Sequence, residues 1–477
     1  MTNSEAEKSH SLVNFFVFDT SRNFPEDEEY KSVVYYYPKE TSKDTQMKEI
    51  GRTAAILKFS QTFGTSGTCH SLHTRKTRQY FNEPEPGFCM AMTMKLPNMS
   101  LHNDMEPHDK IFNSLLVHSY HMFRLFMGTM SSALKVSEQP EEELEQLKLR
   151  AAYFYSKHLQ MMPLEDADLA DAFLGIQFLP MDKLSFLKVR SLVSHVEQTF
   201  PCITSTTVLY QDQIIWTGLC QDDIQLIYNY LTTKLFPASL SLNTETRFLT
   251  GPTDVHSMSS EMRIPHVFLN HSQTIPDECQ LVVYRIAGVT VCLFIPASVE
   301  LDHDFFVYRI AGVTVCLFIP ASVELDHDFF ASLDLIVGPR IVALSADVAE
   351  QALVRKTNSS LNTGTDSIRF LYFNQWNMAF KSTLHQSIPG HRRILQCQPS
   401  ANNDVIKTCA DLCEDFSSFG EGEILVRTKS DAWVIGKLSN QRHLYVVVTR
   451  KNAELVDICD EVRRLRNFLF KDILLLE

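Results

Sequence analysis

The chain has 477 residues, enough for two to four ordinary domains. Its residues are 44% hydrophobic and 21% charged, which is typical of a globular protein and excludes long disordered stretches. The formal net charge of -13, from 44 Lys plus Arg against 57 Asp plus Glu, argues against a protein that coats nucleic acid.

The cysteines and the first residues indicate a cytosolic chain with free thiols. Eleven cysteines occur without a C-x-x-C pair, and the polar start MTNSEAEKSHS lacks the pattern of a secretory leader. The most apolar stretch runs from Leu281 to Leu301, but Arg285 interrupts it and β-branched residues fill it. A buried strand or hairpin is therefore favoured over a membrane span.

The first third of the chain predicts the order strand, strand, helix, strands, helix. Asp44 is the expected N-cap of the first helix and Gly64 its expected end. The predicted strands are 12–18, 32–38, 79–83 and 88–96, and the apolar faces of the two helices are Met47, Ile50, Ala54 and Leu57, then Phe112, Leu115, Leu116, Phe123, Phe126 and Met130.

The same order returns twice. The second pass predicts a hairpin at 204–218, a helix through Ile224, Ile227, Leu231 and Leu235, and strands at 263–269 and 279–286. The third pass predicts a hairpin at 368–383, a helix at 404–416, a meander at 423–450 and a last helix through Leu455, Ile458, Val462 and Leu465.

Three such passes predict an α+β protein of three modules, each an antiparallel sheet with packed helices. The expected domains are 10–165, with an acidic bridging helix at 138–160, then 166–358, then 365–477. The polar stretch 355–367 is the expected second linker.

One segment is written twice. VYRIAGVTVCLFIPASVELDHDFF occupies residues 283–306 and again 307–330. The first copy continues the predicted strand that begins with CQLV. The second copy leads into a predicted helix, which Gly338 and Pro339 are expected to end and whose apolar face is Leu325, Phe329, Leu333 and Ile336. Functional repeats come in three or more diverged units, so an in-frame duplication or an error in the gene model is favoured. With both copies present, the surplus residues must form an extra strand pair or an apolar loop.

No catalytic signature for a kinase, hydrolase or metalloprotease is present. His118 and His121 lie on one predicted helix without a third ligand at matching spacing, so no metal site and no cofactor are expected. Cys409 and Cys413 are interpreted as small buried side chains of a helix.

The most unusual polar stretch is HTRKTRQYFNEPEPG at 73–87. Arg75, Lys76 and Arg78, followed by Tyr80 and Phe81, are the candidate residues for binding an acidic or phosphate-bearing partner. A solvated strand edge, where Lys and Arg discourage edge pairing, is the alternative interpretation. The basic run VRRLRNF at 462–468 is a candidate for contact with anionic lipid, or an ordinary outer face of a terminal helix.

Several segments together resemble one known family. SLVNFFVFDTSR, VVYYYP, SLHTRKTRQYFNEPE, YLTTKLFP, RFLTGP, LDLIVGP and SDAWVIGK look like the vacuolar fusion protein Ccz-one family, in this order and across nearly the whole chain. The chain departs from that family in the duplicated 24 residues, of which the family has one copy. The resemblance implies that each of the three modules is a longin domain.

The resemblance also implies a function. Members pair with a Mon-one protein as a guanine-nucleotide exchange factor for the Rab-seven GTPase, in endosome maturation, lysosomal fusion and autophagy, with a third subunit in animals. The implied location is peripheral on late endosomes and lysosomes, through recruiting Rab proteins and phosphoinositide. An exchange factor needs no nucleophile, because it acts by differential binding, so no enzyme of the ordinary kind is expected.

Two other classes remain to be compared. A longin-domain tethering or adaptor subunit of an exchange complex for a different Rab is the main alternative. A small-molecule enzyme is disfavoured for want of a site. The resemblance carries over no catalytic residue; it places the GTPase platform on the first module, which contains Arg75 to Phe81.

Overall fold

The fold is described from a computed structural model of the chain. It describes residues 11–22, 25–63, 69–96, 108–134, 140–162, 164, 167–200, 203, 205–235, 248–249, 266–269, 277–287, 289–294, 312–320, 327–362, 368–384, 403–449, 455–456, 458–460 and 462–463. These residues separate into two compact units, one up to Ala172 and one from Phe173 onward.

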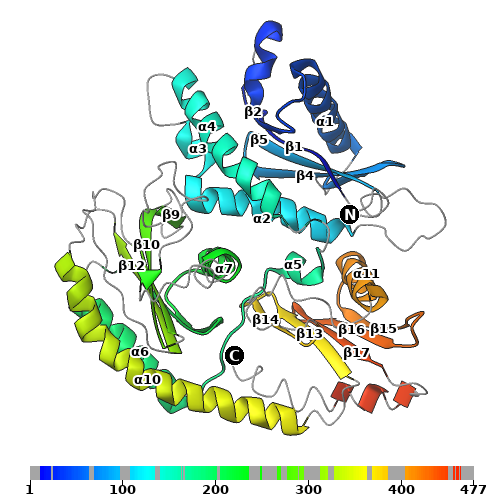
Figure 1. Ribbon diagram of the computed structural model, residues 1–477. Helices are drawn as coiled ribbons and strands as arrows, with labels where there is room; N and C mark the ends of the chain where they lie inside the picture. Colours follow the sequence, from blue (N-terminus) through cyan, green and yellow to red (C-terminus); the bar gives the residue numbers. More distant parts are fainter. Residues whose placement is uncertain are drawn as a thin grey trace, which may run out of the picture. The chain divides into compact units, whose positions relative to one another are not determined.

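Unit 1 contains the first domain, a five-stranded sheet with helices on both faces (Figure 1). The sheet order is β2-β1-β5-β4-β3, and all its pairs are antiparallel. Its elements are β1 (Ser11–Asp19), η1 (Glu26–Ser32), β2 (Val33–Tyr37), α1 (Lys43–Phe63), β3 (Ser71–His73), β4 (Thr77–Glu85), β5 (Phe88–Lys95), α2 (Asp109–Met127), α3 (Met130–Ala133) and α4 (Pro140–His158), followed by η3 (Leu159–Met161).

Both faces of this sheet are buried. On one face, Phe16, Phe18 and Phe81 pack with Ile50 of α1. On the other face, Phe15 meets Tyr155 of α4 with ring centroids 5.0 Å apart. Because both faces are covered, the strands are runs of apolar residues rather than alternating ones.

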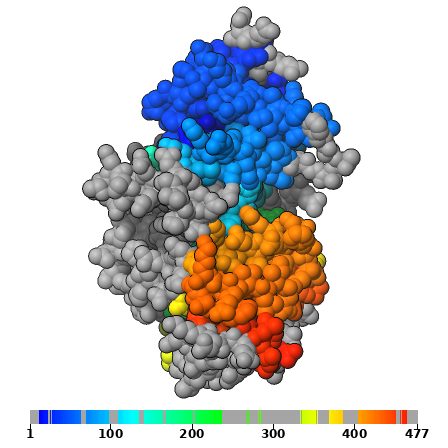
Figure 2. All heavy atoms as spheres, turned by 90° about the vertical axis from the view of Figure 1, so that its right-hand side faces the viewer, coloured from blue at the N-terminus to red at the C-terminus, as the bar shows by residue number. Residues whose placement is uncertain are grey.

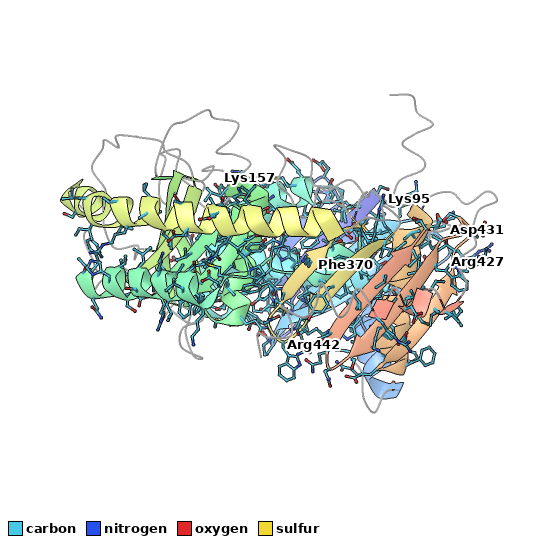
Figure 3. All side chains as sticks on the ribbon, turned by 90° about the horizontal axis from the view of Figure 1, so that it is seen from below. Lys95, Lys157, Phe370, Arg427, Asp431 and Arg442 are labelled. Atoms are coloured by element: carbon cyan, nitrogen blue, oxygen red, sulfur yellow. The ribbon has the colours of Figure 1, made fainter. Side chains whose placement is uncertain are left out.

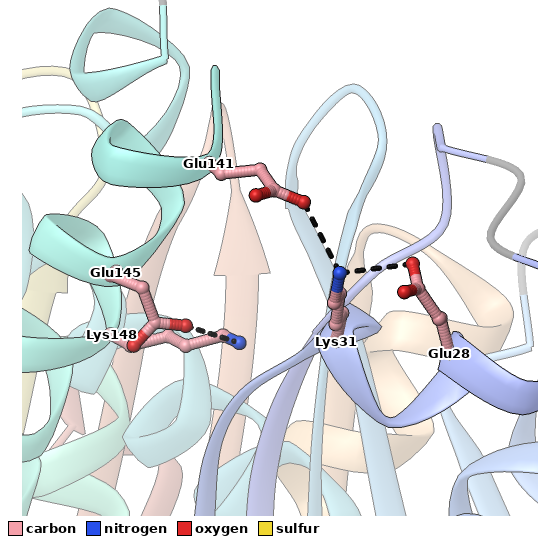
Figure 4. A network of polar contacts seen from close by, with 5 residues as sticks. All are labelled: Glu28, Lys31, Glu141, Glu145 and Lys148. Carbon is pink, nitrogen blue, oxygen red and sulfur yellow. Dashed lines mark hydrogen bonds and ion pairs between the residues drawn. The ribbon is translucent and has the colours of Figure 1, made fainter. Parts of the chain in front are cut away.

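α4, the predicted bridging helix, packs within unit 1. Phe154 and Tyr155 are fully buried, and Phe123 of α2 stacks on Tyr155 at 5.4 Å. At its start, Glu141 accepts a hydrogen bond from Lys31 of η1 at 3.2 Å, and Lys31 also donates to Glu28 at 2.9 Å (Figure 4). These two carboxylates raise the pKa of Lys31 above its ordinary value. Since all three side chains are solvated, the network contributes little stability, and the buried aromatic residues hold α4 in place.

The cap of α1 differs from the prediction. The helix begins at Lys43, so Asp44 lies inside its first turn. Ser42 is the capping residue, because its hydroxyl accepts a hydrogen bond from the Thr45 N–H at 3.3 Å. Asp44 still contributes, since a carboxylate in the first turn interacts favourably with the helix dipole. The helix is described as far as Phe63, and Gly64, its predicted end, lies outside the described residues.

Tyr35 of β2 offers a test of the core of the first domain. Its ring is 5% exposed, and its hydroxyl has no hydrogen-bond partner among the described residues. We expect Tyr35→Phe to raise the free energy of unfolding by about 1 kcal/mol, because a desolvated unpaired hydroxyl is removed. Thermal unfolding at pH 8 measures this, with the exposed Tyr30→Phe as the matched control. A destabilised Tyr35→Phe protein would contradict the prediction.

The same variant has a pH signature. Burial raises the pKa of Tyr35 from 10.0 to about 12 in the folded chain. The neutral phenol is therefore the form that folding favours, and this contribution is present below pH 10 and is lost between pH 10 and about 12. Unfolding temperatures of Tyr35→Phe are expected to fall less steeply over that interval than those of the parent.

The second domain, in unit 2, is also an α+β layer structure. Its sheet runs β7-β6-β11-β12-β10-β8, with β9 paired to β10. Its elements are α6 (Lys183–Thr199), β6 (Ser205–Tyr210), β7 (Gln213–Thr217), α7 (Gln221–Tyr230) with a π-helical end at Leu231–Leu235, β8 (Phe248–Leu249), β9 (His266–Leu269), β10 (Asp277–Ala287), β11 (Val289–Phe294), β12 (Gly312–Pro320) and α10 (His327–Asn362).

α10 corrects two predictions. The helix does not stop at Gly338 and Pro339 but continues to Asn362, which also places most of the predicted linker 355–367 in the helix. Val337, Ile341, Leu344 and Val348 keep one buried stripe across the proline. Pro339 itself is exposed, so the carbonyl that loses its helical hydrogen bond lies on the outer side. Packing of this stripe outweighs the cost of the proline, about 3 kcal/mol. The solvated ion pair between Lys188 of α6 and Asp347, 2.5 Å apart, adds little.

The third domain repeats the topology of the first. Its sheet order is β14-β13-β17-β16-β15, all antiparallel. Its elements are β13 (Ile368–Asn374), β14 (Ala379–Ser382), α11 (Asn403–Phe419), β15 (Gly422–Arg427), β16 (Trp433–Ser439) and β17 (Arg442–Val448). α11 and the β15–β16 hairpin form one continuous orange surface in Figure 2. At the tip of that hairpin Arg427 and Asp431 lie side by side, 3.1 Å apart (Figure 3).

A short segment joins the second and third sheets within unit 2. Ile176 donates to the carbonyl of Met378 at 2.7 Å and accepts from the N–H of Phe380, in β14, at 2.8 Å. Three residues later, Leu179 donates to the carbonyl of Ile214, in β7, at 2.9 Å. We call residues 175–179 the connecting segment, because they extend the edges of both sheets.

These observations confirm an α+β fold of three sheets with packed helices, in which every described strand pair is antiparallel except β11 with β12. The exact domain boundaries remain predictions. Among the described helices, none combines the length and the apolar character that crossing a membrane requires.

Candidate partner-binding surface

The candidate site begins at the turn between β3 and β4. Thr74 organises this turn, because its hydroxyl accepts from the N–H of Thr77 at 2.9 Å and from that of Lys76 at 3.4 Å. The backbones of Thr74 and Thr77 are also bonded, at 3.0 Å. Arg75 and Lys76 are therefore presented on a fixed loop rather than on a loose one.

A third cation borders the turn. Lys95, labelled in Figure 3, ends β5 and pairs with Thr77 across the ladder. The neighbouring Leu96 N–H donates to the carbonyl of Lys76 at 2.9 Å. Arg75, Lys76 and Lys95 are all exposed, and we call these three residues the basic edge. Such a group attracts carboxylates or phosphates from solution.

The other three predicted site residues lie inside the domain. Tyr80 is fully buried and stacks on Phe112 of α2 at 5.5 Å, and Phe81 is 3% exposed in the core beneath α1. Arg78 is 8% exposed, and its guanidinium donates to the carbonyl of Thr74 at 3.4 Å. Thus Arg78 supports the turn from within, while Tyr80 and Phe81 anchor β4 in the core.

Sequence reasoning missed a polar cluster beside the turn. Asp109, the first residue of α2, accepts from Ser71 at 2.6 Å and contacts Nε2 of His73 at 2.6 Å, through the same carboxylate oxygen. In a catalytic triad the histidine lies between the serine and the carboxylate, so this arrangement cannot activate the serine. Asp109 instead holds the edge strand β3 to the start of α2. The local sequence does not predict this contact, because Ser71 and Asp109 are 38 positions apart.

The remaining candidates have structural surroundings. Cys409 and Cys413 are buried in α11, as their interpretation as packing residues predicts. His118 and His121 are partly buried on α2, and no group of three or more potential metal ligands occurs among the described residues. The basic run 462–468 lies outside the described residues beyond Arg463.

Comparison with family models identifies all three domains. Residues 12–128 match "First Longin domain of INTU, CCZ1 and HPS4", residues 203–338 match "Intu longin-like domain 2", and residues 364–465 match "Intu longin-like domain 3". The three sheets described above are thus the sheets of three longin-like domains.

Curated relatives match the chain from end to end. A protein of Xenopus tropicalis named "Vacuolar fusion protein CCZ1 homolog" is 34% identical over 98% of both chains. Proteins of the same name from Nematostella vectensis and Dictyostelium discoideum are 33% and 24% identical, over 98% and 97% of both chains. With three matching longin domains and relatives above 30% identity over nearly its full length, this chain belongs to the CCZ1 family of vacuolar fusion proteins.

Proposed function

We propose that this chain is one subunit of a heterodimeric guanine-nucleotide exchange factor that acts with a Mon-one protein on the Rab-seven GTPase. The observation that carries the proposal is the match to CCZ1 homologues over 98% of both chains. Three longin-like domains, two with the same five-stranded order, agree with a scaffold whose surfaces bind other proteins.

Such a subunit works by binding. An exchange factor that binds the nucleotide-free GTPase more tightly than the loaded form lowers the barrier to nucleotide release. The chain then supplies shape and charge, and no nucleophile. We place contact with the GTPase or partner on the first domain, at the basic edge, because these cations are exposed on an ordered turn and the strand end beside it and fit an acidic or phosphate-bearing surface.

The remaining assignments belong to the same proposal. The dimer acts peripherally on late endosomes and lysosomes, in endosome maturation, fusion and autophagy, recruited by other Rab proteins and phosphoinositide. A third subunit joins in animals.

The basic edge gives the proposal a residue-level test. We expect Arg75→Glu combined with Lys76→Glu to lower the catalytic efficiency of exchange about tenfold, because exposed charges mainly govern the association rate. Initial rates of fluorescent GDP release at low and at high salt measure the effect, which should shrink as salt rises. The matched control is Arg340→Glu with Lys429→Glu, two exposed cations outside unit 1. Equal exchange rates for the two double variants would contradict a role in binding and would favour the alternative, in which Arg75 and Lys76 belong to a solvated strand edge.

An adaptor or tethering subunit acting with a different Rab is the second candidate. One observation favours it: the family model of the first domain groups CCZ1 with INTU and HPS4, so that domain alone does not select a GTPase. A panel of purified GDP-loaded Rab proteins, each tested with the assembled heterodimer, separates the two. Acceleration on Rab-seven supports the first proposal, and acceleration on another Rab without Rab-seven supports the second.

A further inference from the structure

The three sheets of this protein share one plan. In the first and third sheets, the last strand of the domain lies centrally, between the first and the fourth strand: β5 between β1 and β4, and β17 between β13 and β16. The second sheet has β7 and β6 at one side and β10 with β8 and β9 at the other. The plan therefore leaves one central position between β6 and β10.

Two strands with the same sequence match that position. β11 comes from the first copy of the duplicated segment and β12 from the second. Leu209 of β6 pairs with Thr290 of β11 and also with Thr314 of β12, which is the same residue 24 positions later. β11 and β12 are also parallel to each other, and each paired residue lies opposite its own repeat, as Val291 does opposite Val315.

The pairing with β10 shows the same register. Leu281 of β10 pairs with Phe294 of β11, and Val283 pairs with Cys316 of β12. The residue of the first copy that corresponds to Cys316 is Cys292. A pair of Val283 with Cys292 would continue the ladder that Leu281 and Phe294 begin. Both copies thus pair with β10 in one register, and both pair with the same residues 208–210 of β6.

A strand has only two edges. β7 pairs with β6 on one edge, and β8 and β9 pair with β10, so a single edge of each remains for a central strand. An edge bonds to one neighbour at each residue, because every N–H and C=O points to one side. The pairings of β11 and β12 are therefore alternatives to one another.

We propose that the two copies are interchangeable occupants of one central strand position. In one conformation β11 fills it, entering by a tight hairpin because β10 ends at Ala287 and β11 begins at Val289. In the other conformation β12 fills it and runs on toward α10, which begins seven residues after Pro320. The central strand has the same sequence in both conformations, and in each of them the 24 residues of the other copy lie in a connection. We therefore expect the populations of the two conformations to lie within about tenfold of each other.

Proline tests this occupancy one copy at a time. A proline lacks the N–H that a central strand needs, so it excludes its own copy from the position. We expect Val291→Pro and Val315→Pro each to leave the second domain folded, because the other copy takes over, and the double variant to unfold it. The readout is amide exchange of β6 at residues 208–210, which pair with both copies and which neither substitution alters. Expected protection is within about threefold of the parent in each single variant and is lost in the double variant.

Three outcomes would overturn the proposal. If one single variant behaves as the double and the other as the parent, one copy alone fills the position. If both single variants unfold the domain, the copies are two separate strands that are needed together. If the double variant stays protected, neither copy lies in the sheet.

A single-copy chain supplies the control. Deleting 283–306 or 307–330 gives the same polypeptide, since the copies are adjacent and identical. This chain should fold with unchanged β6 protection and should unfold its second domain when the remaining valine becomes proline. Tolerance of proline there would contradict a central strand. A dimer that forms with two copies and dissociates with one would place the second copy in another chain, which also contradicts interchange within one molecule.

Discussion

Replacing Gly175 by alanine is expected to separate the second and third sheets of unit 2. An alanine Cβ at this position would lie 2.1 Å from Cβ and 2.7 Å from Cγ of Phe380. Cβ of Phe380 is fixed to the backbone of β14, so the side chain cannot rotate away from the clash. The connecting segment must move, and the hydrogen bonds that Ile176 makes with Met378 and Phe380 are lost.

The expected cost is large. Overpacking of this kind costs about 1–3 kcal/mol, and each lost backbone hydrogen bond adds about 1 kcal/mol, so we expect a loss of about 3–5 kcal/mol. Amide exchange of Ile176 and Phe380 should rise together, while that of β16 stays protected. Gly422→Ala is the matched control, because a Cβ there meets no atom within 4 Å. Protection at Ile176 equal to that of the parent would show that the segment tolerates a side chain.

Removing the carboxylate of Glu85 is expected to have a comparable effect in the first domain. Glu85 ends β4 and is 7% exposed. One oxygen accepts from the Tyr120 hydroxyl at 2.7 Å and from the Met130 N–H at 2.6 Å. The other oxygen accepts from the N–H of Ser131 at 2.8 Å and from its hydroxyl. A single buried side chain thus holds the end of the sheet to α2 and to the start of α3.

We expect Glu85→Ala to lower the free energy of unfolding of the first domain by about 3 kcal/mol or more, because it leaves several buried donors without an acceptor. Glu85→Gln keeps one acceptor and should cost about 1–3 kcal/mol. Amide exchange at Met130 and Ser131 reports the loss locally. Glu83→Gln, at an exposed position of the same strand, is the control. If Met130 and Ser131 exchange at the parental rate in Glu85→Ala, the carboxylate does not hold α3.

The elements that could be predicted from the sequence are those with a strong local pattern. The hairpins, the helix through Ile224 and Ile227, and the meander of the third domain follow from apolar periodicity and turn residues, and all of them form. The predicted helix end at Pro339 was wrong. A proline disfavours a helix locally, but the buried stripe from Val337 to Val348 stabilises α10 by tertiary packing, which the local sequence does not reveal.

The candidate site could be predicted only in part. Arg75 and Lys76 are exposed at a turn, as their position between two strands indicates. Tyr80 and Phe81 lie close to them in the sequence, but they belong to a sheet that is covered by helices on both faces. The side chains of both residues are therefore buried. Which residues of a strand are buried depends on helices that follow much later, here α2 with Phe112.

The measurement that tests the proposed function most directly is the release of a fluorescent GDP from Rab-seven in the presence of this chain, the proposed Mon-one partner, or both. We expect slow release with either protein alone and a strong acceleration with the assembled pair, because the proposed exchange factor is a heterodimer. Equal acceleration by this chain alone would contradict the obligate heterodimer. Unchanged release with the assembled pair would contradict the proposed function itself.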